Sequence, residues 1–175
     1  MSKAFTIHEQ HRPHFVTFTV HQWVDVFTRK CYVDIFLASI QFAQTHKGLL
    51  VFGWVVMTNH VHLIIGSKDN KLSDIIRDVK KFTARQLVKA IETNEKESRK
   101  QWLLWLLKKD NTIWFWEDGY HGEEIRTMEF FQVKLNYIHQ NPVRAGIVAK
   151  EEEYVYSSSC DFNGNRKGLL ELAAI

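Results

Sequence analysis

Apolar and polar positions repeat with two different periods along the chain, and each change of period marks a predicted element. Residues 14–20 are rich in β-branched and aromatic side chains, which favours a strand. Residues 33–46 instead repeat apolar side chains at helical spacing, and Gly48 is placed to end that helix. Two further apolar runs, residues 49–57 and 60–66, are separated by a Thr-Asn turn and predict a hairpin.

The second half of the chain continues with longer helical patterns and a shorter strand. Its apolar spacing, capping residues and proline position set the expected boundaries. The expected elements are a helix over residues 74–91 capped by Ser73, a very apolar helix over 101–109, a strand over 112–116, a loop over 117–122, and a helix over 128–140 that Thr127 caps and that ends before Pro142.

This order of elements predicts an α+β fold on the ferredoxin-like β-α-β-β-α-β plan. We expect an antiparallel sheet with helices on one face, plus a C-terminal tyrosine-bearing helix. One domain over residues 1–160 would carry a helical insertion at about 93–111 and be followed by a fraying C-terminal tail over 161–175. The apolar 102–107 segment is expected to pack on the core or, alternatively, to form a dimer contact.

Composition narrows the class of protein. Hydrophobic residues make up 45% of the 175-residue chain, which argues against disorder, and no apolar run is long enough to span a membrane. We expect no signal peptide and no membrane association, and we expect two reduced thiols, Cys31 and Cys160, in a cytoplasmic protein. A net charge of +3 is too small to indicate nucleic-acid binding by itself.

Candidate chemistry gathers at two places in the sequence. His60 and His62 are two residues apart in a predicted strand, so both imidazoles share one face, opposite to Val61. Tyr137 and Asn141 are four apart in a predicted helix and share one face there. Two imidazoles and an amide oxygen could bind Zn²⁺, Mn²⁺ or Mg²⁺, although such a histidine pair alone is more often structural.

Taken together and in order, these motifs resemble those of the HUH single-tyrosine transposases of the IS200-like family. The segment 59–63 resembles the His-hydrophobe-His motif, and the segment 137–146 resembles the tyrosine motif. The match is closest to the REP-associated branch, where Asn stands at the position of Asn141; the better-known insertion-sequence transposases have Gln there. The resemblance covers about residues 10–160.

The resemblance implies an enzyme that cleaves and rejoins single-stranded, hairpin-flanked DNA through a 5′-phosphotyrosine intermediate. Tyr137 would be the catalytic nucleophile, and His60, His62 and Asn141 would bind a divalent metal, Mg²⁺ or Mn²⁺. The expected partners are single-stranded or hairpin DNA and a second copy of the chain in a homodimer. The general base is left open between His121 and His139.

A basic stripe is the candidate DNA-binding surface. Cations recur every four residues along the second long helix. Such a stripe is usually only a solvated helix face, but in a DNA nuclease it could bind successive phosphates of the DNA. The DNA-binding candidates are Arg77, Lys80, Lys81, Arg85, Lys89 and Arg144.

Two other functions compete with the enzyme hypothesis. The chain could be a non-catalytic or domesticated ferredoxin-like nucleic-acid-binding protein that keeps the fold. It could also be an unrelated zinc hydrolase built on His60 and His62. The presence of both Tyr137 and Asn141 favours the transposase over the first alternative, and the lack of acidic or Cys ligands near either motif disfavours the second.

Overall fold

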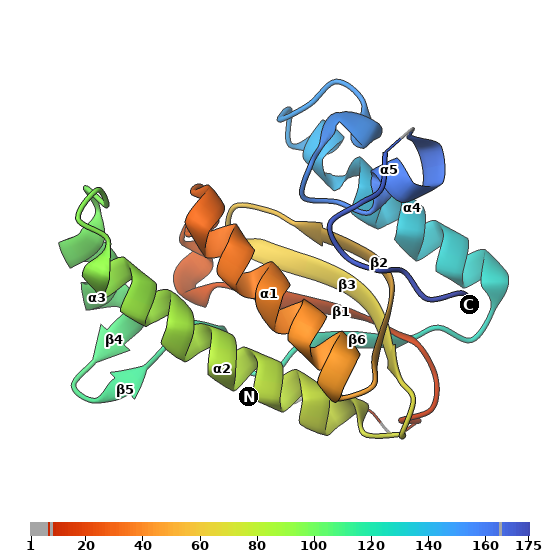
Figure 1. Ribbon diagram of the computed structural model, residues 1–175, viewed down its shortest axis with the longest axis horizontal. Helices are drawn as coiled ribbons and strands as arrows, with labels where there is room; N and C mark the ends of the chain where they lie inside the picture. Colours follow the sequence, from red (N-terminus) through yellow and green to blue (C-terminus); the bar gives the residue numbers. More distant parts are fainter. Residues whose placement is uncertain (1–6, 8, 165) are drawn as a thin grey trace.

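The structure is a computed structural model that describes residue 7 and residues 9–164 and 166–175 (Figure 1). Its centre is a four-stranded antiparallel sheet in the order β2-β3-β1-β6. This order confirms the predicted ferredoxin-like α+β fold. The strands are β1 (His14–Thr19), β2 (Leu49–Val56), β3 (His60–Ser67) and β6 (His121–Glu124).

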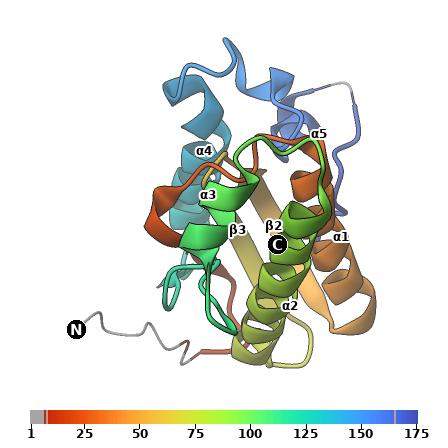
Figure 2. The same ribbon diagram turned by 90° about the vertical axis from the view of Figure 1, so that its left-hand side faces the viewer.

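Two long helices cover one face of the sheet. α1 (Lys30–His46) and α2 (Leu72–Thr93) pack side by side over the main hydrophobic core (Figure 2). Val61, Leu63 and Ile65 of β3 point into this core, as the strand pattern predicts. Their burial removes apolar surface from water and fixes which face of β3 is left for His60 and His62.

The opposite face is covered by α4 (Met128–Arg144), on the other side of the sheet from α1 and α2 (Figure 2). Phe131, Leu135 and Ile138 of α4 form a second apolar cluster with the sheet residues Phe15 and Ile64, among others. The predicted tyrosine-bearing helix therefore covers much of the sheet face opposite to α1 and α2.

α4 also runs further than predicted. Thr127 caps it as expected, accepting a hydrogen bond from the backbone N–H of Phe130 at 3.1 Å. The predicted stop before Pro142 is wrong, because a proline in the last turn removes only one helical hydrogen bond. The helix ends where Gly146 adopts a φ of +70°, and its amide bonds the carbonyl of Val143.

The fourth strand of the sheet was misassigned from the sequence. Residues 112–116 do not form it: β5 (Thr112–Ile113) pairs only with β4 (Lys108–Lys109), and Trp116 makes a single bridge to Val20. The strand that pairs with the other edge of β1, away from β3, is β6, whose first residues were expected to be loop. Its sequence, His-Gly-Glu-Glu, has no apolar alternation because it is a polar edge strand.

The insertion between α2 and the last strand of the sheet is α3 (Lys100–Leu107) followed by the β4–β5 hairpin, at one end of the molecule (Figure 1). Leu103 and Leu107 are buried in the main core, which confirms core packing for one side of the segment. The other side exposes the indoles of Trp102 and Trp105. A dimer contact through these indoles stays a prediction.

Smaller elements complete the chain and correct two further expectations. Ser73 does not cap α2; its amide and hydroxyl bond the side chain of Gln10 instead. The tail does not fray after Asp161, since Leu170 is buried and the amide of Ala173 bonds the carbonyl of Val51. The remaining elements are η1 (His21–Trp23), η2 (Glu151–Glu153) and α5 (Ser159–Asn163). Cys31 and Cys160 are both free.

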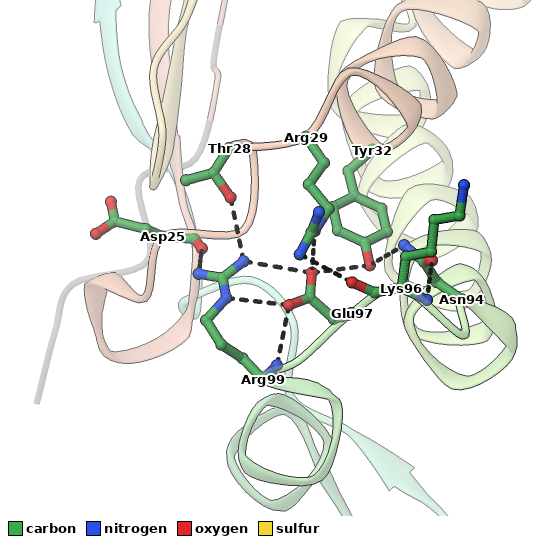
Figure 3. Close-up of polar contacts among 8 residues, drawn as sticks. All are labelled: Asp25, Thr28, Arg29, Tyr32, Asn94, Lys96, Glu97 and Arg99. Atoms are coloured by element: carbon green, nitrogen blue, oxygen red, sulfur yellow. Dashed lines mark hydrogen bonds and ion pairs between the residues drawn. The ribbon is translucent and has the colours of Figure 1, made fainter.

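A buried carboxylate joins two separate segments of the chain, residues 25–32 and 94–99, near α3 (Figure 3). The fully buried side chain of Glu97 accepts hydrogen bonds from Arg29 Nε at 2.7 Å and from Arg99 Nε at 3.1 Å. Arg99 also donates to the backbone oxygen of Asp25 and to Thr28 Oγ1. The cluster therefore fixes the segment that follows η1 against the start of α3.

The pKa of Glu97 reflects two opposing effects, burial and hydrogen bonding. Burial alone would raise it, but the hydrogen bonds from Arg29 and Arg99 outweigh burial and lower the pKa to about 2. Because the carboxylate is more acidic in the folded state, its stabilising contribution is complete above its ordinary pKa near 4.5 and is lost as the pH falls towards 2.

Replacing Glu97 by alanine leaves two guanidinium groups without their buried partner. We expect Glu97→Ala to lower the free energy of unfolding by about 3 kcal/mol at pH 7, measured by urea denaturation. Glu92→Ala is the matched control, because Glu92 pairs with Lys108 at the surface, and it should change stability by less than about 1 kcal/mol. Equal effects of the two substitutions would show that the buried cluster contributes no more than a surface ion pair.

Candidate active site

The two histidines of β3 lie side by side on the face that α4 covers. Their ring centroids are 4.7 Å apart. His62 is buried, whereas His60, at the first position of the strand, is half-buried. The predicted shared face is confirmed, because Val61 and Leu63 point to the opposite core.

Each ring is oriented by a neighbouring polar side chain. Asn59 Nδ2 donates to the backbone oxygen of Trp23 at 3.2 Å, so Asn59 Oδ1 is the acceptor that faces His60 Nδ1 at 2.7 Å. His60 Nδ1 therefore carries the proton and its Nε2 keeps a lone pair. His62 Nδ1 lies 2.8 Å from Thr17 Oγ1 of the adjacent strand.

Burial keeps both imidazoles neutral. Burial lowers the pKa of His60. Burial lowers the pKa of His62 to about 3, together with repulsion from Arg144, from Lys134 and from His60 whenever His60 is protonated. At neutral pH neither ring is protonated on both nitrogens. Neutral imidazoles are the form that ligates metal ions.

The residues present fit a metal ion. The Nε2 atom of His62 is buried and has no hydrogen-bond partner, although buried polar atoms are nearly always satisfied. A cation ligated by this nitrogen would satisfy it. Among the described residues, no group of three or more His, Cys, Asp or Glu side chains could hold a metal ion, and Asn141 is the predicted third ligand.

α4 brings Tyr137 to the histidine pair. Its ring centroid lies 5.3 Å from that of His62 and 5.9 Å from that of Phe15. The side chain is 40% exposed, so the phenol is reachable from solvent. Arg144, two turns later on α4, stacks on the phenol at 4.6 Å and donates to the backbone oxygen of Tyr137.

Asn141 follows Tyr137 by one helical turn and is half-buried. Both lie within α4, because the helix continues through Pro142. The structure therefore gathers three predicted site residues, His60, His62 and Tyr137, in one place, and it puts Asn141 on the same helix face as the tyrosine.

The two candidate general bases differ in position. His139 is buried, bonds Ser158 Oγ at 2.9 Å and packs on Phe162; burial lowers its pKa to about 4. It is a structural residue of α4. His121 of β6 is exposed and pairs across the sheet with Thr17, which in turn pairs with His62. His121 therefore lies in the same cross-strand row as the site.

Five of the six predicted DNA-binding residues lie on α2, on the far side of the sheet from Tyr137. Arg77, Lys81, Arg85 and Lys89 are exposed, and Arg77 pairs with Asp74 and Asp78. Lys80 turns inward and donates to the backbone oxygens of Glu117 and Gly119, and burial lowers its pKa to about 8. The structure brings only Arg144 to the histidine pair.

Sequence reasoning missed Lys134 and Trp23. Lys134 Nζ lies 4.6 Å from the centroid of the Phe15 ring and donates to Glu123 Oε1. The ring centroid of Trp23 lies 5.8 Å from that of His60. Lys134 precedes Tyr137 by three residues on the predicted helix, so its spacing could have drawn attention to it. No local pattern points to Trp23, whose position depends on the path of the chain after β1.

Comparison with known proteins decides the family. The family model described as "Transposase IS200 like" matches residues 8–141. The chain belongs to the IS200-like transposase family. The protein is thus a DNA transposase, and the family implies DNA-cleaving activity. A search of curated proteins found no match to this transposase.

A solved structure shares the fold of this transposase. It is described as the structure of a REP-associated tyrosine transposase bound to a REP hairpin. The TM-score is 0.65 at 19% sequence identity, and the alignment covers 90% of this chain and 82% of the other. In the described part of the transposase, no helix is both long and apolar enough to cross a membrane.

The close seating of α4 on the sheet should tolerate no added methyl group at Gly53. A Cβ there would lie 2.6 Å from Leu135 Cδ1 of α4. We expect Gly53→Ala to lower the free energy of unfolding by about 1–3 kcal/mol, measured by urea denaturation. The double variant Gly53→Ala/Leu135→Ala removes the clashing atom and should lose less than the sum of the two single variants. Additive losses would mean that the two residues do not contact.

Proposed function

We propose that the transposase cleaves and rejoins single-stranded, hairpin-flanked DNA through a covalent bond to Tyr137. Tyr137 Oη attacks the phosphorus of the scissile phosphodiester and gives up its proton. The bond from phosphorus to the 3′-oxygen breaks, and this oxygen leaves with a proton as a free 3′-hydroxyl. The 5′-phosphotyrosine keeps the energy of the phosphodiester, so attack by another 3′-hydroxyl can rejoin the strand.

The observation that carries this proposal is the contact between an exposed phenol and a buried histidine with an unpartnered nitrogen. Tyr137 lies against His62, whose Nε2 is unsatisfied. A buried ring nitrogen without a protein partner is available to a ligand. A hairpin as substrate is supported by the structurally similar transposase, which is described as bound to a REP hairpin.

His60, His62 and Asn141 would hold the divalent metal of the site. Mg²⁺ or Mn²⁺ bound there supplies positive charge to the oxygens of the scissile phosphate. Two neutral imidazoles and an amide oxygen carry no negative charge, so they do not repel the phosphate. Asn59 and Thr17 orient the two rings from the second side, as hydrogen-bonded partners of metal-binding histidines do.

The cations divide into two groups under this proposal. Arg144, stacked on Tyr137, is placed to bind a phosphate at the scissile position. Lys81, Arg85 and Lys89 on α2 would bind DNA only where it passes around the other side of the sheet. Arg77 and Lys80 are held by protein partners, and we assign them no more than a supporting electrostatic role.

A covalent-trap assay tests the nucleophile. The protein is incubated with 5′-labelled and 3′-labelled hairpin DNA carrying single-stranded flanks, in Mn²⁺ or Mg²⁺, and analysed on a denaturing gel. We expect a protein–DNA adduct that retains the label 3′ of the cleavage point, and its loss by at least about a thousandfold in Tyr137→Phe. Tyr120→Phe is the matched control and should form the adduct normally.

The assay also separates the transposase from a binding protein that keeps only the fold. An adduct that persists in Tyr137→Phe would refute the nucleophile assignment. Tight hairpin binding without any adduct, across a panel of hairpins and both metals, would favour a non-catalytic nucleic-acid-binding role.

Metal binding is tested separately from cleavage. We expect His62→Ala to weaken Mn²⁺ binding more than about tenfold, measured by isothermal titration calorimetry, because it removes a ligand. His14→Ala is the control: His14 is also a buried histidine of the sheet, but it lies on the α1–α2 side and bonds the backbone oxygen of Arg12. Equal Mn²⁺ affinity of the two variants would show that His62 is not a ligand.

A further inference from the structure

An exposed indole stands next to the histidine pair in a strained turn. Trp23 is 59% exposed, and its ring centroid lies 5.8 Å from that of His60 in an edge-on arrangement. Gln22 and Trp23 have φ angles of +53° and +55°. Left-handed backbone is unfavourable for residues with a Cβ, and most of all for bulky ones, so two in succession require support from their surroundings.

Hydrogen bonds from three sides supply that support. The amide of Gln22 donates to Glu117 Oε1 at 2.7 Å, and Asn59 Nδ2 donates to the oxygen of Trp23 at 3.2 Å. The Glu97 cluster fixes the following residues, where Arg99 donates to the oxygen of Asp25 at 2.8 Å. The strain therefore has the effect of presenting a rigid indole to solvent instead of burying it.

Asn59 links this turn directly to the site. One amide side chain bonds the backbone of Trp23 through Nδ2 and His60 Nδ1 through Oδ1. The indole is thus fixed relative to a proposed metal ligand by a single residue. The indole therefore lies, in a fixed position, where an aromatic group that arrives with the phosphate could stack on it.

We propose that Trp23 is a stacking platform for an unpaired nucleobase next to the scissile phosphate, an inference that rests on the proposed function of the His60–His62 site. Every base presents a π-face, so an indole can hold one without reading its identity. Trp23 would be a positioning residue: it fixes the strand so that one phosphodiester lies between Tyr137 and the histidines. His21, which belongs to the same turn as Trp23, contacts a second exposed indole, that of Trp114, which extends the aromatic surface.

The first test measures binding without cleavage. In the Tyr137→Phe background and without metal, the affinity for a fluorescent single-stranded oligonucleotide is followed by anisotropy. We expect Trp23→Gly to weaken binding about tenfold and Trp23→Phe, which keeps a ring, to weaken it less than about threefold. Trp105→Ala is the matched control: its indole is 74% exposed on α3 and should not contribute.

Glycine is chosen because it relieves the left-handed backbone. Trp23→Gly should therefore be at least as resistant to urea as the parent protein, so that lost affinity cannot be attributed to unfolding. An unchanged affinity in Trp23→Gly, or an equal loss in Trp105→Ala, would overturn the inference.

The second test locates the base. Abasic nucleotides are placed one at a time along the oligonucleotide. We expect one position where removing the base weakens binding to the parent protein about tenfold but does not weaken binding to Trp23→Gly. If, at every position, the loss of affinity caused by the abasic nucleotide multiplies with the loss caused by Trp23→Gly, the proposed stacking contact is refuted. These outcomes are independent of the covalent-trap assay: if no adduct forms with any hairpin, the proposed function fails, whereas an adduct with unchanged binding in Trp23→Gly refutes only the role of Trp23.

Discussion

The position of Tyr137 depends on how closely α4 packs against the second face of the sheet. Leu135 and Ile138, on either side of the tyrosine in sequence, are buried in the apolar cluster beneath the helix. Gly53, where the register of β2 shifts, leaves space for Leu135. Hydrophobic packing of α4 thus sets the distance between a phenol and two imidazoles that belong to a different part of the chain. Under the proposed function, this packing is what brings the nucleophile to the histidine pair.

Much of the fold followed from hydrophobic periodicity, and the exceptions have identifiable causes. The β1, β2, β3, α1 and α2 segments carry strong apolar patterns because they surround the main core. β6 was missed because an exposed edge strand needs only backbone pairing, and Pro142 was overrated as a helix stop because the last turn tolerates proline. Both errors concern segments stabilised by tertiary contacts rather than by their own sequence preference.

The candidate site was predictable where it depends on local periodicity and unpredictable where it depends on topology. Alternation along β3 was sufficient to place His60 and His62 on one face, and the step of four joined Tyr137 to Asn141. The basic stripe of α2 also followed from periodicity, but no local rule tells which side of the sheet a helix covers, and it lies away from Tyr137. Trp23 reaches His60 through a turn with two left-handed residues, Gln22 and Trp23, and neither residue type predicts that conformation.

The charges around the site distinguish it from a generic buried histidine pair. His62 is neutral and buried, yet Arg144 and Lys134 place positive charge close enough to help lower its pKa. Lys134 is already paired with Glu123, so the positive charge beside the neutral ligands comes mainly from Arg144. A metal ion would add to this charge, and an anion such as a phosphate could balance it. A zinc hydrolase acting on neutral substrates gains nothing from such a field. Under the proposed function, a phosphodiester bound beside Arg144 would balance this charge, and it would lie next to Tyr137, the one exposed phenol of α4.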